Sequence, residues 1–182
     1  MALFGNDWPL ELEIGSGKGT FLLAESGARP EVNFLGIEYA RRYWIFAGDR
    51  LRRAERKNAR VVLAEASGFV RDFIEKESLS AIHLYFPDPW PKTRHHRRRL
   101  LQPVFVDELA SRLKRGARLS IATDHREYFE KIAAAVKRSP LVEADFAGTR
   151  AALESEVVGS NFERKYRQEG RDIFMLAAEK PR

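Results

Sequence analysis

Five short apolar runs alternate with segments of helical period along the first two thirds of the chain. The runs cover residues 10–14, 33–38, 59–64, 81–86 and 117–124. The helical segments between and after them cover residues 20–28, 41–57, 68–75, 103–114 and 127–137. Strands that alternate with helices in this way build a mostly parallel sheet with helices on both faces. The sequence therefore predicts a Rossmann-like, doubly wound α/β fold.

The last third of the chain changes in style. Residues 141–146 and 173–179 have the pattern of strands, and a polar stretch of residues 149–171 separates them. No convincing crossover helix is visible between these two strands, so we expect an antiparallel hairpin whose C-terminal strand closes one edge of the sheet. A long insertion in a compact domain is more often functional than idle.

Composition limits the kinds of protein this chain can be. Its 182 residues fit a single domain, residues 1–182, that is large enough to bury a core. No cysteine is present, which excludes disulfides and thiolate chemistry, and no apolar run is long enough to span a bilayer. We expect a cytoplasmic protein, a monomer or a homodimer, without a membrane partner. The net charge of +6 permits a nucleic-acid partner.

A proline-rich stretch, Phe86-Pro-Asp-Pro-Trp-Pro91, follows the fourth run directly. Proline lacks the N–H that a central strand or a helix interior requires, so the strand must stop here in a rigid loop. That loop holds Asp88 and Trp90 at the carboxyl end of a strand, where open α/β sheets bind ligands. A basic tract, residues 92–99, comes immediately afterwards. A rigid turn with a solvated charged loop is the alternative interpretation.

A glycine turn, Gly15-Ser-Gly-Lys-Gly19, lies between the first strand and the first helix. A P-loop would need a glycine where Leu12 stands, and Glu13 would repel its phosphates. A dinucleotide site would need a different glycine spacing, although Glu38 could bind a ribose. S-adenosylmethionine carries an ammonium and a sulfonium, so it tolerates nearby carboxylates. This third interpretation is favoured.

An acidic residue stands at or beside the carboxyl end of each of the five predicted strands. They are Glu13, Glu38, Glu65, Asp88 and Asp124. Carboxyl ends of parallel strands meet at one edge of the sheet, so these residues predict a negatively lined crevice that suits a cationic ligand.

The same residues carry a resemblance to a known family. Glu13 with Gly15, Gly17 and Gly19, followed by Gly36-Ile-Glu38, resembles the cofactor site of class I S-adenosylmethionine-dependent methyltransferases. The segment 86–99 resembles the more specific signature of bacterial tRNA (guanine-N7-)-methyltransferases, which modify the variable-loop guanine at position 46. Thr123-Asp124 and Ser160-Asn-Phe-Glu163 match as well. The resemblance covers nearly the whole chain, in order.

The resemblance implies a role for each matching position. Glu13, Glu38, Glu65 and the three glycines would bind S-adenosylmethionine, and Asp88 would be the active-site residue at its junction with guanine. Substrate contacts would come from Lys92, Asp124, Ser160, Asn161, Phe162 and Glu163. Contacts to the RNA backbone would come from Arg94, His95, His96, Arg97, Arg98 and Arg99. No metal is implied, since His95 and His96 lack partners at metal-ligand spacing.

Several positions depart from the family pattern. Glu65 replaces a usual Asp, Ser160 a usual Thr, and Asn161 a usual Lys. The chain also starts where the family usually has a further N-terminal segment, so we expect weaker RNA affinity or a weaker cofactor lid.

Guanine N7 carries a free lone pair, so methyl transfer needs alignment and no general base. Positive charge then spreads over the purine, and carboxylates facing its N1–H edge would stabilise the transition state. Asp88, Asp124 and Glu163 are the candidates. Trp90 or Phe162 could stack on the extruded base. Methyl transfer to another RNA or a small molecule, or a non-catalytic RNA-binding protein, are the alternatives.

Overall fold

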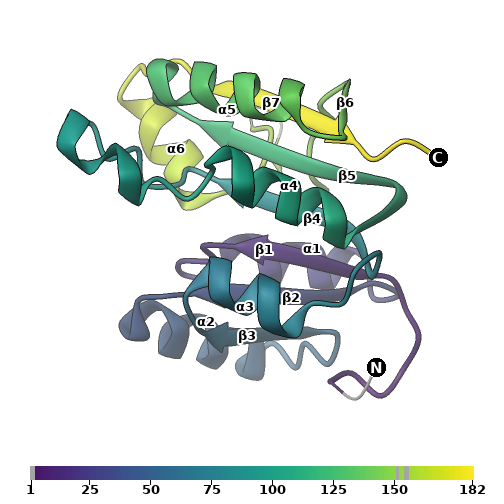
Figure 1. Ribbon diagram of the computed structural model, residues 1–182. Helices are drawn as coiled ribbons and strands as arrows, with labels where there is room; N and C mark the ends of the chain where they lie inside the picture. The colour runs from purple at the N-terminus through teal and green to yellow at the C-terminus, as the bar shows by residue number, and fades with distance from the viewer. Residues whose placement is uncertain (1–2, 151, 154–155) are drawn as a thin grey trace.

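The computed structural model describes residues 3–150, 152–153 and 156–182, and it contains one seven-stranded sheet (Figure 1). The strand order is β3-β2-β1-β4-β5-β7-β6. The strands are β1 (Leu10–Ile14), β2 (Asn33–Glu38), β3 (Ala59–Leu63), β4 (Leu79–Tyr85), β5 (Leu113–Thr123), β6 (Val142–Ala144) and β7 (Phe174–Glu179). β1 to β5 pair in parallel, which confirms the predicted doubly wound α/β fold.

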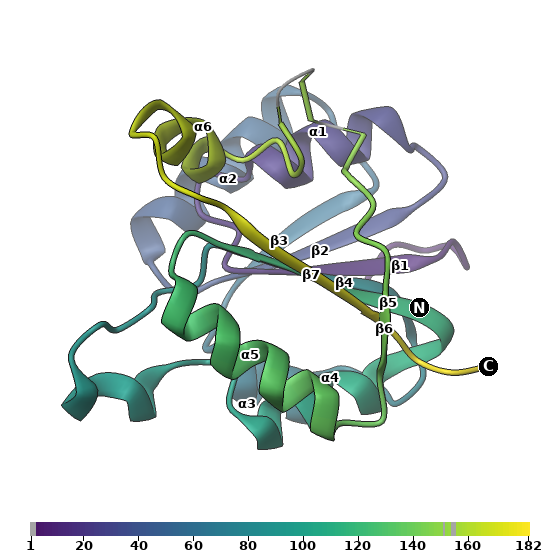
Figure 2. The same ribbon diagram turned by 90° about the horizontal axis from the view of Figure 1, so that it is seen from above.

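Helices cover both faces of this sheet (Figure 2). They are α1 (Thr20–Ala28), α2 (Arg41–Arg53), α3 (Ala66–Phe73), the 3-10 helix η1 (Thr93–Arg98), α4 (Pro103–Arg112), α5 (Arg126–Arg138) and α6 (Asn161–Gln168). Figure 2 shows α1, α2 and α6 on one face, with α3, α4 and α5 on the other. Within the described residues, no helix has the length and apolar character needed to cross a membrane.

The central strands are apolar because helices shield both of their faces. Leu12 in β1, Ile82 in β4 and Leu119 in β5 are fully buried. The strand order reverses between β1 and β4, since β2 and β3 extend to one side and β5 to the other. Such a reversal opens a crevice at the carboxyl ends of the two strands, and this crevice is where ligands bind in open α/β sheets.

The C-terminal strand is antiparallel, as predicted, but the connection before it is not a plain loop. β7 pairs antiparallel with β5 on one side and with the short β6 on the other, so β6 occupies the outermost position. The segment between them contains α6, which sequence reasoning missed. Its signal was present: Ser160 caps the helix, and Glu163 follows three residues later in the spacing of a capping box.

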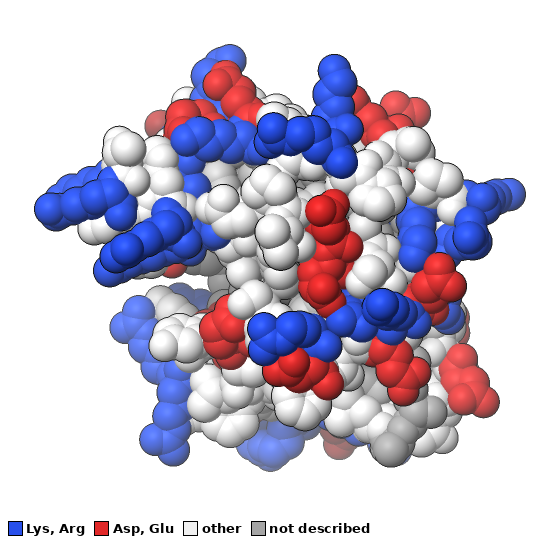
Figure 3. All heavy atoms as spheres, in the orientation of Figure 1, with Lys and Arg blue, Asp and Glu red and all other residues white. Residues whose placement is uncertain are grey.

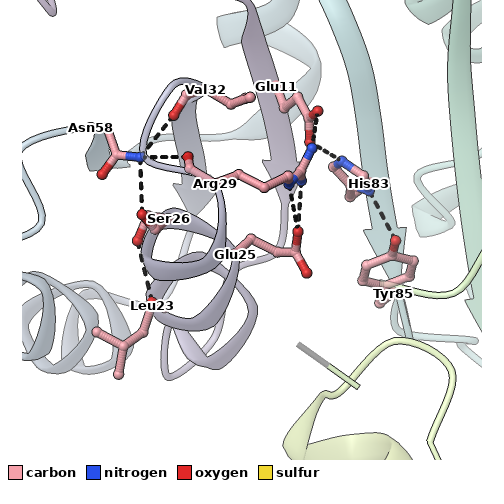
Figure 4. A network of polar contacts seen from close by, with 9 residues as sticks. All are labelled: Glu11, Leu23, Glu25, Ser26, Arg29, Val32, Asn58, His83 and Tyr85. Carbon is pink, nitrogen blue, oxygen red and sulfur yellow. Dashed lines mark hydrogen bonds and ion pairs between the residues drawn. The ribbon is translucent and has the colours of Figure 1, made fainter. Parts of the chain in front are cut away.

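A buried polar network ties β1, α1 and β4 together just below the reversal point (Figure 4). Glu11 forms a two-pronged ion pair with Arg29, at 2.6 and 2.7 Å. Its Oε2 also lies 2.9 Å from Nε2 of His83, whose Nδ1 lies 2.9 Å from the Tyr85 hydroxyl. Burial by itself raises the pKa of Glu11, but His83 and Arg29 outweigh that effect and lower the pKa to about 2. The network therefore fixes the last residue of β4.

Candidate active site

The glycine turn after β1 has a backbone that only glycine adopts without strain. Gly15, Gly17 and Gly19 have φ angles of 80°, 52° and 67°. A Cβ on Gly19 would also lie 2.8 Å from the Cβ of Ala47 in α2, so this glycine lets the two helices approach closely. The turn is anchored to the neighbouring strand, because the N–H groups of Gly15 and Ser16 donate to the carbonyl of Ile37.

Two adjoining cavities lie against this turn, at the carboxyl ends of β1, β2 and β4. The larger cavity, of about 450 Å³, is lined by Glu38, Glu65 and Asp88 among others. The smaller cavity, of about 270 Å³, is lined by Glu13 and by the start of α6. The two cavities share their walls at Gly15, Gly17, Tyr43, Tyr85 and Phe162. Four of the five predicted strand-end acids therefore face one continuous space.

Glu13 is the most unusual of these acids. Its side chain is buried, and its Oε2 has no hydrogen-bond partner among the described residues. Burial, reinforced by the negative charge of Glu38, raises its pKa to about 8. A buried carboxylate without a partner is costly unless a donor or a cation approaches it. This geometry fits a cationic ligand in the smaller cavity.

Glu38 and Glu65 both shape the larger cavity through their backbone contacts. Each Glu38 oxygen accepts one N–H, Oε1 from Ala40 and Oε2 from Gly17, both at 2.7 Å. Each carboxylate oxygen has two lone pairs, so Glu38 can still accept from a ribose hydroxyl. Glu65 caps α3: its oxygens accept from the N–H groups of Ser67 and Gly68. These bonds lower the pKa of Glu65 although desolvation opposes them.

The proline-rich loop after β4 is held in a strained shape. Phe86 and Trp90 have φ angles of 53° and 43°, an uncommon region for bulky residues. Between them Asp88 is exposed at the rim of the larger cavity. The indole of Trp90 contacts the guanidinium of Arg98, 5.0 Å from its centroid, and the ring of His95 at 5.8 Å. Trp90 thus braces the loop against the basic tract.

The basic tract folds as η1, and its predicted RNA-facing residues divide into different environments. Lys92, Arg94, Arg97 and Arg98 are exposed, and His95 and His96 are half-buried. Arg99 is buried and its guanidinium is engaged within the protein, so its predicted contact with the RNA backbone stays a prediction. Its guanidinium donates to the Pro89 carbonyl at 2.6 Å and pairs with Glu127 at 2.6 Å. Arg99 is therefore a structural clamp between the proline-rich loop and α5.

The segment at the start of α6 reaches the cavities, except for its last residue, Glu163. Ser160 and Asn161 line the smaller cavity, and Asn161 donates to the hydroxyl of Thr20 at 2.9 Å. Phe162 is 46% exposed and lines both cavities. Glu163 is fully buried and accepts from the N–H groups of residues 157, 158 and 159, at 2.7 to 3.0 Å. Arg167 also donates to this carboxylate at 2.9 Å, so both oxygens are fully engaged within the segment and Glu163 lines neither cavity.

Asp124 lies apart from the other acids. It lines neither cavity and pairs with Arg171 at 2.7 Å. The prediction that five acids surround one crevice therefore holds for four. Sequence reasoning also missed two tyrosines that line both cavities, Tyr43 and Tyr85. Tyr85 could have been inferred from its place as the last residue of a strand at the reversal point.

The chain resembles known proteins along almost its whole length. Residues 7–176 match a family model described as "Putative methyltransferase". A protein of Rhodopirellula baltica named tRNA (guanine-N(7)-)-methyltransferase is 47% identical over 70% of this chain and 49% of its own length. Its namesake in Rhodococcus jostii is 42% identical over 95% of this chain and 66% of its own length. The chain thus spans about half to two thirds of these two relatives.

A third relative and the solved structures complete the comparison. A tRNA (guanine-N(7)-)-methyltransferase of Alkalilimnicola ehrlichii is 36% identical over 95% of this chain and 73% of its own length. An antibiotic-related methyltransferase superposes with a TM-score of 0.68 over 98% of this chain and 91% of its own, at 16% identity. A SAM-dependent methyltransferase from Aquifex aeolicus gives 0.64 over 94% and 82%, at 13% identity. These two structures share the fold of this chain. The chain belongs to the family of the tRNA (guanine-N(7)-)-methyltransferases.

Proposed function

We propose that this protein transfers the methyl group of S-adenosylmethionine to N7 of the variable-loop guanine, position 46, of tRNA in the cytoplasm. The observation that supports this most directly is the acidic double cavity at the reversal point, which opens beside a tract of exposed cations. A cationic cofactor and a polyanionic substrate would meet there. The names of the relatives supply the chemistry of the substrate.

The residues that line the two cavities fit the cofactor. The partnerless Oε2 of Glu13 could accept from an ammonium group, and the free lone pairs of Glu38 could accept from ribose hydroxyls. The glycine turn presents backbone without side chains, so a ligand can approach it closely. When bound, S-adenosylmethionine supplies an electrophilic methyl group on a sulfonium.

Placement of the base would fall to the rim of the larger cavity. Phe162 is a better stacking partner than Trp90, because its ring is exposed and lines both cavities while the indole contacts Arg98. Phe86 and Tyr166 support that ring, with centroids 6.3 and 6.0 Å away. Asp88 at the rim would accept from the N1–H edge of guanine as positive charge develops there.

Cations flank this rim on both sides. Figure 3 shows Lys and Arg above and below a hollow at the left edge of the molecule, where Figure 1 places η1 and α2. The exposed residues there include Arg94, Arg97 and Arg98 on η1, with Arg41 and Arg42 at the start of α2. Such a field would attract the phosphate backbone without reading sequence.

The test uses labelled S-adenosylmethionine and an unmodified tRNA transcript, followed by nuclease digestion and mass analysis of the nucleosides. We expect 7-methylguanosine from the wild-type protein. A transcript with adenine at position 46 and the Asp88→Ala variant serve as controls, and both should lose the product. Label in another nucleoside would overturn the assigned position, and no transfer at all would refute the proposed activity.

A further inference from the structure

A separate cavity of about 340 Å³ lies between η1, the start of α4 and the outer face of α5. It shares no lining residue with the two cavities of the candidate active site. Five of its ten lining residues carry cationic or protonatable groups: His96, Arg97, Arg99, Lys131 and Arg138. None of the ten described residues that line it is acidic. The cavity is therefore chemically the opposite of the cofactor crevice.

The polar groups of this cavity mainly donate hydrogen bonds. Arginine and lysine side chains have no acceptor at all. The side-chain amide of Gln102 donates to the carbonyls of His96 and Arg99, so it also helps to fix η1. The carboxylate of Glu127 does not line the cavity, but Arg99 and Lys131 both pair with it at 2.6 Å. An occupant must therefore bring its own acceptors and negative charge.

His96 provides the second observation. Its Nδ1 lies 3.3 Å from the ammonium of Lys131, which only donates, so Nδ1 accepts and the proton is assigned to Nε2. This Nε2 is buried and has no hydrogen-bond partner among the described residues. A buried donor without an acceptor is destabilising. His96 also lines the adjoining cavity, and its imidazole would have to turn before an oxygen of the occupant could accept from this buried Nε2.

The spacing along α5 explains why the cavity is open and cationic. Tyr128, Lys131, Ala134 and Arg138 line it at intervals of three or four residues, so they share one face of the helix. Ala134 is small and leaves the space between the two cations unfilled. Lys137, next to Arg138, is an exposed cation that does not line the cavity.

We infer that this cavity binds one phosphate group of the RNA backbone, between Arg97 of η1 and Lys131 and Arg138 of α5. The inference rests on the proposed function and extends it, because it gives the RNA a contact on the face of the sheet that carries α5. Arg97 belongs to the same 3-10 helix as Arg98, which lines the cofactor crevice. A strand bound along η1 would therefore connect the two sites.

The test compares the wild-type protein with Arg138→Gln and with Lys137→Gln, which removes the same charge from the neighbouring position. Dissociation constants for an unmodified tRNA transcript are measured across a range of salt concentrations. We expect Arg138→Gln to weaken binding about three- to tenfold near 0.1 M salt and to reduce the salt slope by about one. Lys137→Gln should change the slope by less than half as much. Affinity for S-adenosylmethionine reports that each variant is folded.

Equal effects of the two substitutions would show non-specific electrostatic attraction without a phosphate site, and would overturn the inference. The absence of any effect of Arg138→Gln would overturn it as well. Titration with inorganic phosphate distinguishes the source of the anion. If Arg138→Gln abolishes phosphate binding but leaves tRNA binding intact, the ligand is a free phosphate and the RNA assignment is wrong. Methyl transfer by the wild-type protein is measured separately. If the methyl group is transferred but Arg138→Gln does not weaken tRNA binding, the phosphate site alone is refuted. If Arg138→Gln weakens tRNA binding but no methyl group is transferred, the proposed activity alone is refuted.

Discussion

The raised pKa of Glu13 predicts that cofactor binding releases a proton. With a pKa of about 8 in the free protein, this carboxyl is about 90% protonated at a pH of about 7. An ammonium or sulfonium in the smaller cavity would favour the ionised form, so binding must first ionise Glu13. Affinity for S-adenosylmethionine should therefore rise with pH until the pKa of Glu13 is passed.

The size of the effect follows from the same value. Between pH values of about 6 and 7.5, the ionised fraction of a group with a pKa of about 8 rises about twentyfold, so the dissociation constant should fall about twentyfold. Calorimetry in buffers of different ionisation enthalpy should detect about 0.9 proton released per cofactor at a pH of about 7. This pH range lies below the pKa of the cofactor's own amino group, which is near 8 for an ordinary α-amine.

Two variants make the assay specific. Glu13→Gln should remove both the pH dependence and the proton release. Glu65→Gln is the matched control: Glu65 lines the larger cavity but its pKa is lowered, so proton release should persist. The free protein gives an independent check. Glu13 takes up a proton on folding between about pH 4.5 and 8, so its contribution to unfolding free energy should fall by up to ~1.4 kcal/mol per pH unit there. A flat affinity with no proton release would refute the reasoning.

Three further predictions concern groups that hold the site in place. The pKa of Glu11 is shifted in the opposite direction to that of Glu13, so its stabilising contribution is complete above about pH 4.5 and is lost towards pH 2. Glu11→Gln should therefore remove about 3 kcal/mol of the acid dependence of the unfolding free energy, measured by denaturant titration. An unchanged acid midpoint would contradict this. Arg99→Gln should lower the unfolding free energy by about 2–4 kcal/mol, whereas exposed Arg97→Gln should leave it within about 0.5; similar melting temperatures would argue against the clamp. Glu163→Gln should lower the free energy of local opening at the amides of residues 157–159 by about 1–3 kcal/mol, as measured by hydrogen exchange. Unaltered protection of these amides would rule out the role of Glu163 in holding the segment.

Much of the fold, and the place of the two acidic cavities, could be predicted from sequence because two rules are strong. Alternating strands and helices imply a parallel sheet, and the carboxyl ends of parallel strands meet at one edge. Those rules place Glu13, Glu38, Glu65 and Asp88 around one space without knowledge of any side-chain contact. Asp124 obeys the same rule along the chain but sits beyond the cavities, because they extend from the reversal point towards β2 and β3 and not towards β5.

The C-terminal segment was harder because its contacts are made by tertiary structure. The polar composition of residues 149–171 resembles a loop, and α6 is short and carries its apolar ring, Phe162, towards the cavities. Only the Ser160–Glu163 spacing indicates a helix start. The same spacing also explains why Glu163 is unavailable to substrate: the third residue of a capped helix points back to the preceding backbone.

The three consecutive arginines at the end of η1, of which Arg99 is the residue directly after the helix, show why a uniform basic tract does not have a uniform role. Arg97 lines the cationic cavity, Arg98 covers Trp90, and Arg99 is buried against Pro89 and Glu127. Successive residues of a 3-10 helix point about 120° apart, so neighbours with identical chemistry face different surroundings. Loss of Arg99 would weaken the proposed RNA methylation by releasing the loop that carries Asp88, because the guanidinium of Arg99 is held by Pro89 and Glu127. A charge scan judged by activity alone would therefore count Arg99 as an RNA contact, and stability measured on the same variants is what separates the clamp from the interface.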